Sequence, residues 1–367
     1  MYTPITTLLI LLSCALGTLG SSNDSLSQQL FANYDNQVRP NHGGKPTEVA
    51  VGIYVSSFAN IKETSMEYKV FMYFRQFWKD ERLAGKLNKT ISLKGSAISK
   101  VWLPDPYCQN GRESDLGDSD EVVRSLLFVA PDGQITYSRL AKITAECLMD
   151  LQSFPADEQK CSLNFGSYSY PTTEMILKWQ EGDAITVALK DLPQFQFTSI
   201  ATRTINETYS IGNFSLITVY FTFQRRLGYF LIQMYAPDIF IVMLSWIVFW
   251  MDRRDIGNRM ALGITTILTI MFLMGSINES MPKVSYPKAL DWYLIVSFVF
   301  IFCALVECMI AYGTCDTRLG RTKVTIDLDE ERNEKKYLGY WVDFVSRISF
   351  PLLFVVYNAY YWSVYSV

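Results

Sequence analysis

The residues of this chain that could do chemistry are a pair of cysteines, a single histidine and a few charged side chains beside apolar segments. Cys147 and Cys161 bracket thirteen residues that include Phe154, Pro155 and Asp157. Cysteines in an exported segment are expected to be oxidised, so these two are predicted to close a short loop. Four long apolar stretches follow the pair. A closed loop ahead of a membrane bundle indicates an extracellular sensor joined to a pore.

Catalytic and metal chemistry find little support in the sequence. His42 is the only histidine, and nothing that could pair with it lies nearby. No cysteine spacing resembles a zinc site. Cys303 and Cys308 fall in an apolar stretch and are expected to be packed thiols, and Cys108 is the odd cysteine of the exported part. We therefore expect no enzymatic activity, no bound metal and no cofactor.

Length and composition indicate two domains, one in water and one in a membrane. The chain has 367 residues, 49% of them hydrophobic, and the C-terminal part is much the more apolar. The net charge of −3 provides no basic field, so a nucleic-acid partner is not expected. Residues 1–20 have the apolar centre and small residues of a secretory signal peptide.

Residues 21–226 are predicted to form an extracellular β-sandwich domain. Short segments with alternating apolar residues recur between turn signals, as in a sandwich. The clearest predicted strands are Val49–Val55, Tyr68–Phe74, Leu126–Val129 and Phe214–Phe221. Glycosylation acceptors of the Asn-x-Ser/Thr type support an exported face. They begin at Asn23, Asn88, Asn206 and Asn213.

Residues 227–367 are predicted to form an all-α transmembrane domain of four helices. The spans lie at about 229–250, 260–277, 291–312 and 341–365, each close to the ~20 residues that cross a bilayer. Lysine and arginine gather between the first two spans and in the loop at about 313–340, which are therefore predicted to be cytoplasmic. Both termini are then extracellular, in a multi-pass protein of the plasma membrane.

The second span has a helical stripe that suits a water-filled path. The stripe residues recur at spacings of three and four, so they share one helix face. They are Ala261, Thr265, Leu268, Phe272, Gly275 and Glu279. Hydroxyls facing water can solvate ions, and the large apolar members can form constrictions that close by dewetting. One helix cannot enclose a channel, so several copies are required. The alternative is that the threonines bond to their own backbone or to other helices.

Charges at the ends of the spans bear on selectivity. Arg259 follows Gly257 and Asn258 at the predicted cytoplasmic mouth, and a positive ring without an acidic one favours anions. Asp255, four residues earlier, weakens this argument, and simple anchoring of Arg259 is the alternative. Asp238 in the first span is a costly charge in lipid, so we expect its partner on a neighbouring helix.

The motifs together resemble those of the Cys-loop pentameric ligand-gated ion channels. A Trp-x-Asp-x-Arg-Leu motif begins at Trp78, and a Trp-x-Pro-Asp motif begins at Trp102. The Cys147–Cys161 segment matches the signature loop of that family, and residues 261–266 are similar to the pore helix of its γ-aminobutyric-acid and glycine branch. The resemblance covers essentially the whole mature chain.

The resemblance implies a pentamer of identical or related subunits with agonist sites between extracellular domains. On one side of the site, an aromatic box would hold a cationic amine. Its members correspond to Tyr107, Tyr168, Tyr209 and Phe214. On the other side, Tyr73 and Arg75 lie on the strand that binds a ligand carboxylate, assisted by Ser138. The alternative is that the tyrosines are packing residues and that Arg75 is a solvated charge.

The resemblance also implies residues that couple the two domains. They correspond to Glu63, Phe154, Pro155, Asp157, Arg225 and Lys283. Among them, Asp157 and Arg225 are the best candidates for an ion pair. The expected partners of the chain are a small amine or amino acid, permeant ions and membrane lipid.

The chain departs from this family at two functional positions. Gly166 and Ser167 stand where amino-acid receptors usually have an acid, so the ammonium partner is missing from its expected place. Gly257 and Asn258 replace the usual residues before Arg259. We predict a chloride-selective ligand-gated channel. The alternatives are a cation-selective or silent subunit of the same architecture and, less favoured, a membrane-anchored ligand-capture or adhesion protein.

Overall fold

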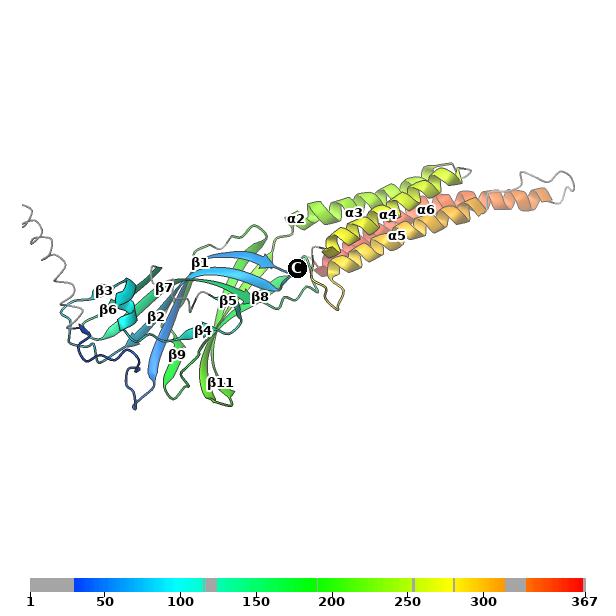
Figure 1. Cartoon of the computed structure of the whole chain (residues 1–367). Helices are drawn as coiled ribbons and strands as arrows, with labels where there is room; N and C mark the ends of the chain where they lie inside the picture. Colours follow the sequence, from blue (N-terminus) through cyan, green and yellow to red (C-terminus); the bar gives the residue numbers. More distant parts are fainter. Residues whose placement is uncertain are drawn as a thin grey trace, which may run out of the picture.

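The computed structural model has a β-sheet domain at one end and a bundle of long helices at the other (Figure 1). It describes residues 30–114, 116, 124–189, 191–252, 255–279, 281–313 and 328–365, with side chains described only from 341 onward in the last range. The predicted signal peptide, Asn23 and residues 314–327 of the predicted cytoplasmic loop lie outside the described residues.

The β domain is a sandwich of two sheets. The strands are β1 (Thr47–Lys62), β2 (Glu67–Lys79), β3 (Ile91–Leu93), β4 (Pro106–Cys108), β5 (Gly111–Ser114), β6 (Ser125–Val129), β7 (Gln134–Glu146), β8 (Glu158–Ser167), β9 (Met175–Trp179), β10 (Ile185–Val187), β11 (Phe195–Tyr209) and β12 (Gly212–Arg225). One sheet has the order β10-β1-β2-β7-β6-β3, with β5 on β7 and β9 on β1, and the other has the order β11-β12-β8-β4. The four predicted strands lie within β1, β2, β6 and β12.

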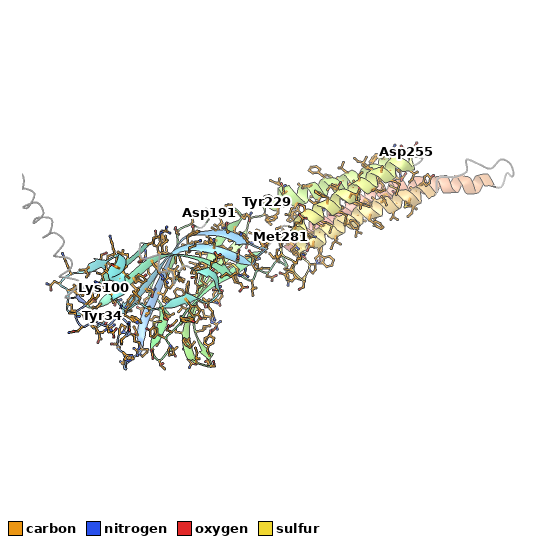
Figure 2. The ribbon with its side chains drawn as sticks, viewed as in Figure 1. Tyr34, Lys100, Asp191, Tyr229, Asp255 and Met281 are labelled. Atoms are coloured by element: carbon orange, nitrogen blue, oxygen red, sulfur yellow. A yellow bond between two sulfur atoms is a disulfide. The ribbon has the colours of Figure 1, made fainter. Side chains whose placement is uncertain are left out.

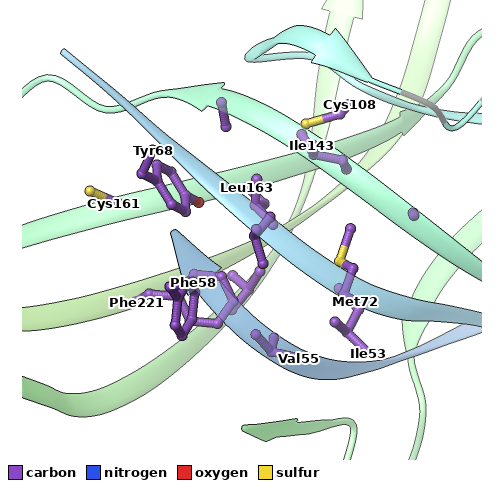
Figure 3. Close-up of a cluster of buried hydrophobic side chains, with 14 of the residues drawn as sticks. Ile53, Val55, Phe58, Tyr68, Met72, Cys108, Ile143, Cys161, Leu163 and Phe221 are labelled. Carbon is purple, nitrogen blue, oxygen red and sulfur yellow. The ribbon is translucent and has the colours of Figure 1, made fainter. Parts of the chain in front are cut away.

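Alternation along the strands builds the core between the sheets. In β2, every second residue from Tyr68 to Trp78 is buried, as the period of a pleated strand requires. Phe58 of β1 packs edge-on against Phe221 of β12 at 5.0 Å between ring centroids, so the two sheets meet through aromatic side chains (Figure 3). Cys108, the odd cysteine of the exported part, is buried in the same core as a free thiol.

Four described helical segments are long and apolar enough to cross a membrane, which confirms the predicted fold class. The first, Gly228–Trp250, consists of α2 (Gly228–Phe230), the π-turn η3 (Leu231–Tyr235), α3 (Ala236–Ser245) and the 3-10 turn η4 (Trp246–Trp250). The others lie in α4 (Ile256–Glu279), α5 (Ala289–Gly313) and α6 (Leu328–Tyr365). Asp255, just before α4, lies at the end of the bundle far from the sandwich, and Met281, just after it, lies at the junction (Figure 2).

Close contacts hold the helices together. A Cβ atom at Gly263 would lie 2.5 Å from Leu305 Cδ1, so the Leu305 side chain packs against α4 in the space that the glycine leaves free. Asp238 of α3 is fully buried, and Ser297 of α5 donates a hydrogen bond of 2.6 Å to its Oδ2. The expectation that Asp238 has a partner on a neighbouring helix is therefore confirmed.

Candidate functional site

The disulfide between Cys147 and Cys161 is formed, and its loop reaches the helical domain. The Phe154–Pro155 peptide bond at the tip is cis, and the Phe154 side chain is completely buried. Three backbone groups of the loop bond to the start of α5 and to the linker before it. The amide of Leu290 donates to Phe154 at 3.2 Å, that of Ala289 donates to Gln152 at 2.8 Å, and Leu151 donates to the Tyr286 hydroxyl at 3.0 Å. The loop is thus attached to the segment that connects α4 with α5.

Arg225 lies at the centre of the junction between the domains. It is 3% exposed, and its Nε and Nη2 donate to the two carboxylate oxygens of Asp157 at 2.7 and 3.1 Å. Its Nη1 donates to Glu63, which follows β1. The guanidinium also lies over the rings of Phe195 and Phe154, at 4.5 and 4.8 Å from their centroids. The predicted pair of Asp157 and Arg225 is therefore present and includes a second carboxylate.

The charge of Arg225 is secured by its surroundings. Burial lowers the pKa of the guanidinium, but the hydrogen bonds and charges of Asp157 and Glu63 outweigh burial and raise the pKa above its ordinary value. The cluster ties the β1–β2 turn and the disulfide loop to the end of β12, which leads directly into α2. Lys283 is exposed and bonds to none of the described residues, so the structure does not bring it into this cluster.

The four predicted aromatic-box residues come together at one end of the four-stranded sheet. Tyr107 on β4 meets Tyr168, just after β8, edge-on at 5.7 Å between ring centroids. Tyr209 on β11 meets Phe214 on β12 at 5.8 Å. Tyr168 is 76% exposed and Tyr209 is 42% exposed, so these rings are not core packing residues. We refer to these four residues as the aromatic cluster.

Asp105, the last residue of the Trp-x-Pro-Asp motif, positions Tyr168. Its carboxylate accepts a hydrogen bond from Ser167 Oγ at 3.0 Å and another from the Ser169 amide at 2.8 Å. The residues on both sides of Tyr168 are therefore held by one side chain, through the hydroxyl of Ser167 and the backbone amide of Ser169. Ser167 is 3% exposed, so its hydroxyl bonds to Asp105 and is not accessible to a ligand.

Glu207 is a residue of this site that the sequence analysis missed. The Tyr209 hydroxyl donates to its carboxylate, and Gln109 Nε2 donates to Glu207 Oε2 at 3.3 Å and to the Tyr209 hydroxyl at 3.0 Å. The bond to the carboxylate raises the pKa of Tyr209 to about 12. Burial and then the negative charge of Glu207 raise the pKa of Tyr107. The available signal was the strand period, which places Glu207 and Tyr209 on one face.

The predicted carboxylate-binding residues lie on the other sheet. Arg75 of β2 stands directly opposite Ser138 of β7 in the strand register, so the two share a face. Tyr73 lies two residues before Arg75 on that face, and both are exposed. The Arg75 guanidinium lies 5.9 Å from the ring centroid of Tyr54. No bond or ring contact joins these residues to the aromatic cluster in the described part of the chain, so one subunit does not bring the two groups together.

The described glycosylation acceptors are all exposed. Asn88 lies in the loop between β2 and β3. Asn206 and Asn213 belong to the β11–β12 hairpin, where Thr208 faces Asn213 and Glu207 faces Phe214. Strand alternation therefore places both asparagines on the face of the hairpin opposite Glu207.

The predicted stripe on α4 is left uncovered by the other three helices. All six stripe residues are exposed, with Leu268 at 63% and Phe272 at 81%. The opposite side of α4 is packed, since Thr266, Ile270 and Ile277 are buried. The hydroxyl of Thr265 donates to Leu262 at 2.8 Å, so its proton is used by the backbone, as the alternative interpretation expected. The hydroxyl oxygen remains on the exposed face.

Arg259 does not lie on the exposed stripe. It is 1% exposed, and its Nη1 and Nη2 donate to the carboxylate of Asp343 on α6 at 3.3 and 3.4 Å. It also donates to the carbonyl of Met251. Gly257 and Asn258 are exposed, as is Asp255, which accepts a hydrogen bond from the Asn258 side chain. Among the residues that the structure describes at this end of α4, the exposed charged side chains are therefore acids.

Comparisons with known proteins agree with the architecture. The family model "Neurotransmitter-gated ion-channel ligand binding domain" matches residues 23–227, and "Neurotransmitter-gated ion-channel transmembrane region" matches residues 234–325. The chain is 38% identical to the γ-aminobutyric acid receptor subunit α-6 of Gallus gallus, over 80% of this chain and 65% of that protein. It is 36% identical to a β subunit of Lymnaea stagnalis, over 76% and 58% of the two chains. A β-like subunit of Drosophila melanogaster is 35% identical over 79% and 61%. The chain thus spans about three fifths of the length of these relatives.

Proposed function

Because the chain belongs to the neurotransmitter-gated ion channels, we propose that it is one subunit of a pentameric channel that a small amine or amino acid opens. The observation that carries this proposal is the uncovered face of α4. Leu268 and Phe272 are largely exposed although the rest of the bundle packs against α4. A membrane tether has no use for such a stripe, whereas a ring of copies would turn it toward a central path.

The agonist site follows from the separation of the two candidate half-sites. The aromatic cluster lies at one end of the four-stranded sheet, and Arg75 with Ser138 lies on the face of the other sheet. Neighbouring subunits would join them, with the rings around a cationic group and Arg75 on a carboxylate. Such a site suits a ligand that carries both a positive and a negative group. The site is complete only where two neighbouring subunits meet.

Opening would be transmitted through the junction. A ligand that binds more tightly when the β11–β12 hairpin closes shifts the population toward that state. Arg225 ends β12 of this hairpin, and Asp157 joins it to the loop that bonds α5. The proposed topology places both termini and the sandwich outside the plasma membrane. Figure 1 agrees with this topology, since α6 ends beside the junction.

Chloride selectivity is proposed because the relatives described above are γ-aminobutyric acid receptor subunits. A second candidate is a cation-selective or silent subunit. It is favoured by one observation, namely that Arg259 is buried on Asp343 while Asp255 is exposed at the predicted mouth. Exposed charges at a mouth select ions more strongly than charges already paired inside the protein.

Ion substitution separates these candidates. The chain is expressed alone in oocytes under voltage clamp and tested with amines and amino acids. We expect an agonist-evoked current whose reversal potential moves to more positive values when external chloride is replaced by gluconate. A reversal potential that follows sodium instead would reject the anion proposal. A subunit that reaches the surface but passes no current would support the silent candidate.

Phe272 is expected to limit conduction. Five large rings at one level of a pore would narrow it and repel water, and the Phe272 side chain is 81% exposed. Phe272→Ala should therefore raise the single-channel conductance severalfold. Met271→Ala is the matched control, because Met271 is also exposed at 52% but lies about 100° around the helix. Equal conductance in the Phe272→Ala channel and the wild type would place this ring outside the path.

A further inference from the structure

One carboxylate lies inside the aromatic cluster. Glu207 is half-buried on β11, faces Phe214 across the hairpin register and lies two residues before Tyr209. The hydroxyl of Tyr209 and Nε2 of Gln109 both donate to it. Burial raises the pKa of Tyr107, and the negative charge of Glu207 raises it further. The carboxylate therefore also interacts electrostatically with the β4 side of the cluster.

The partners of Glu207 orient its carboxylate without neutralising it. Tyr209 and Gln109 are uncharged donors, and none of the ion pairs in the described part of the chain includes Glu207. Arg203, the nearest arginine on this strand, lies four residues earlier, about 13 Å away at the rise of a β-strand. A carboxylate among aromatic rings and neutral donors favours a cation, because both its charge and the ring faces attract one.

We propose that Glu207 binds the ammonium group of the ligand, in place of the acid that is missing before Tyr168. This inference rests on the proposed agonist site and adds its charged specificity residue. The ligand class is a primary amine, protonated at neutral pH. The ammonium donates to the Glu207 carboxylate and is flanked by rings of the aromatic cluster, while Gln109 fixes the carboxylate. The charge therefore comes from β11 instead of the end of β8.

The test measures binding without requiring conduction. Full-length protein in detergent is titrated with n-butylammonium and with n-butanol, its uncharged analogue, by saturation-transfer NMR. The wild type should bind the ammonium more tightly. In Glu207→Gln, the Kd for n-butylammonium should rise at least tenfold, the effect expected for a lost charge-assisted contact. The Kd for n-butanol should change less than twofold, because the substitution keeps the shape of the side chain.

Two further variants exclude a structural explanation. Glu181→Gln removes an exposed acid in the turn after β9 and should leave both affinities unchanged. Glu207→Asp keeps the charge and should retain n-butylammonium binding within about fivefold. The inference is overturned if Glu207→Gln binds n-butylammonium like the wild type, if the wild type does not prefer the ammonium to the alcohol, or if all Glu207 variants lose both probes equally. If the protein prefers the ammonium to the alcohol but no agonist evokes a current, the proposed channel activity is rejected and the role of Glu207 in binding is retained.

Discussion

Arg225→Ala is expected to abolish the agonist-evoked current in receptors that still reach the cell surface. Arg225 is 3% exposed and holds the carboxylates of Asp157 and Glu63 together. Removing one partner of a buried ion pair costs about 3–5 kcal/mol, because the remaining charge stays buried without compensation. We expect the open state to bear this cost. Since about 1.4 kcal/mol is a factor of ten, the gating equilibrium should then shift by more than a hundredfold toward the closed state.

The neighbouring arginine provides the control. Arg226 pairs with Asp191 at 2.7 Å, but both side chains are largely exposed, at 47% and 79%. Exposed pairs contribute about 0–1 kcal/mol. Arg226→Ala should therefore shift the agonist concentration for half-maximal current less than fivefold. Surface biotinylation of each variant separates a loss of gating from a loss of protein at the membrane.

Charge exchange then tests the pairing itself. Asp157→Arg and Arg225→Asp should each be silent, and the double variant should recover part of the response. Full recovery is not expected, because Glu63 would then lie beside the new aspartate at position 225. Strictly additive effects of the two substitutions would contradict direct coupling of this pair, since coupled residues depart from additivity.

The fold was readable from the sequence because its signals are local. Alternating apolar residues in Tyr68–Phe74 indicated a strand, and uninterrupted apolar runs of sufficient length indicated membrane helices. These regions form β2 and the four helical spans. Asp157 and Arg225 could be paired in advance only through family motifs, since 68 residues separate them.

For two site features, local signals were not sufficient. Glu207 lies among exposed residues of β11, and an acid is common on an exposed strand. Its role depends on the fold, which places Phe214 opposite it in the hairpin and Gln109 beside its carboxylate. Arg259 was predicted to line the cytoplasmic mouth because it precedes the second span. Helical spacing gives the angle of a Cα atom but not the direction of a long side chain, and Asp343 lies 84 residues away in the sequence.

Arg259→Ala is expected to impair assembly before it affects ion selectivity. Arg259 on α4 and Asp343 on α6 are 1% and 2% exposed, and Glu307 of α5, at 7%, interacts with both. The Arg259 guanidinium is thus the positive partner of one acid on α6 and one on α5. Without it, two carboxyl groups stay buried in the bundle with no positive partner, at a cost of about 3–5 kcal/mol. We expect at least tenfold less assembled receptor in detergent, measured by size-exclusion chromatography of a fluorescent fusion.

Removing the acids together with the arginine should reverse this loss. Replacing a whole buried ion cluster by well-packed hydrophobic residues of similar volume is often neutral for stability. Arg259→Met combined with Asp343→Leu and Glu307→Met should therefore restore most of the assembled peak. Asp255→Asn, an exposed acid at the same end of α4, should leave assembly unchanged and alter only the permeating ions. If Arg259→Ala assembles normally and instead changes the reversal potential, then Arg259 faces the conducting path in the assembled receptor and its bond to Asp343 is broken there.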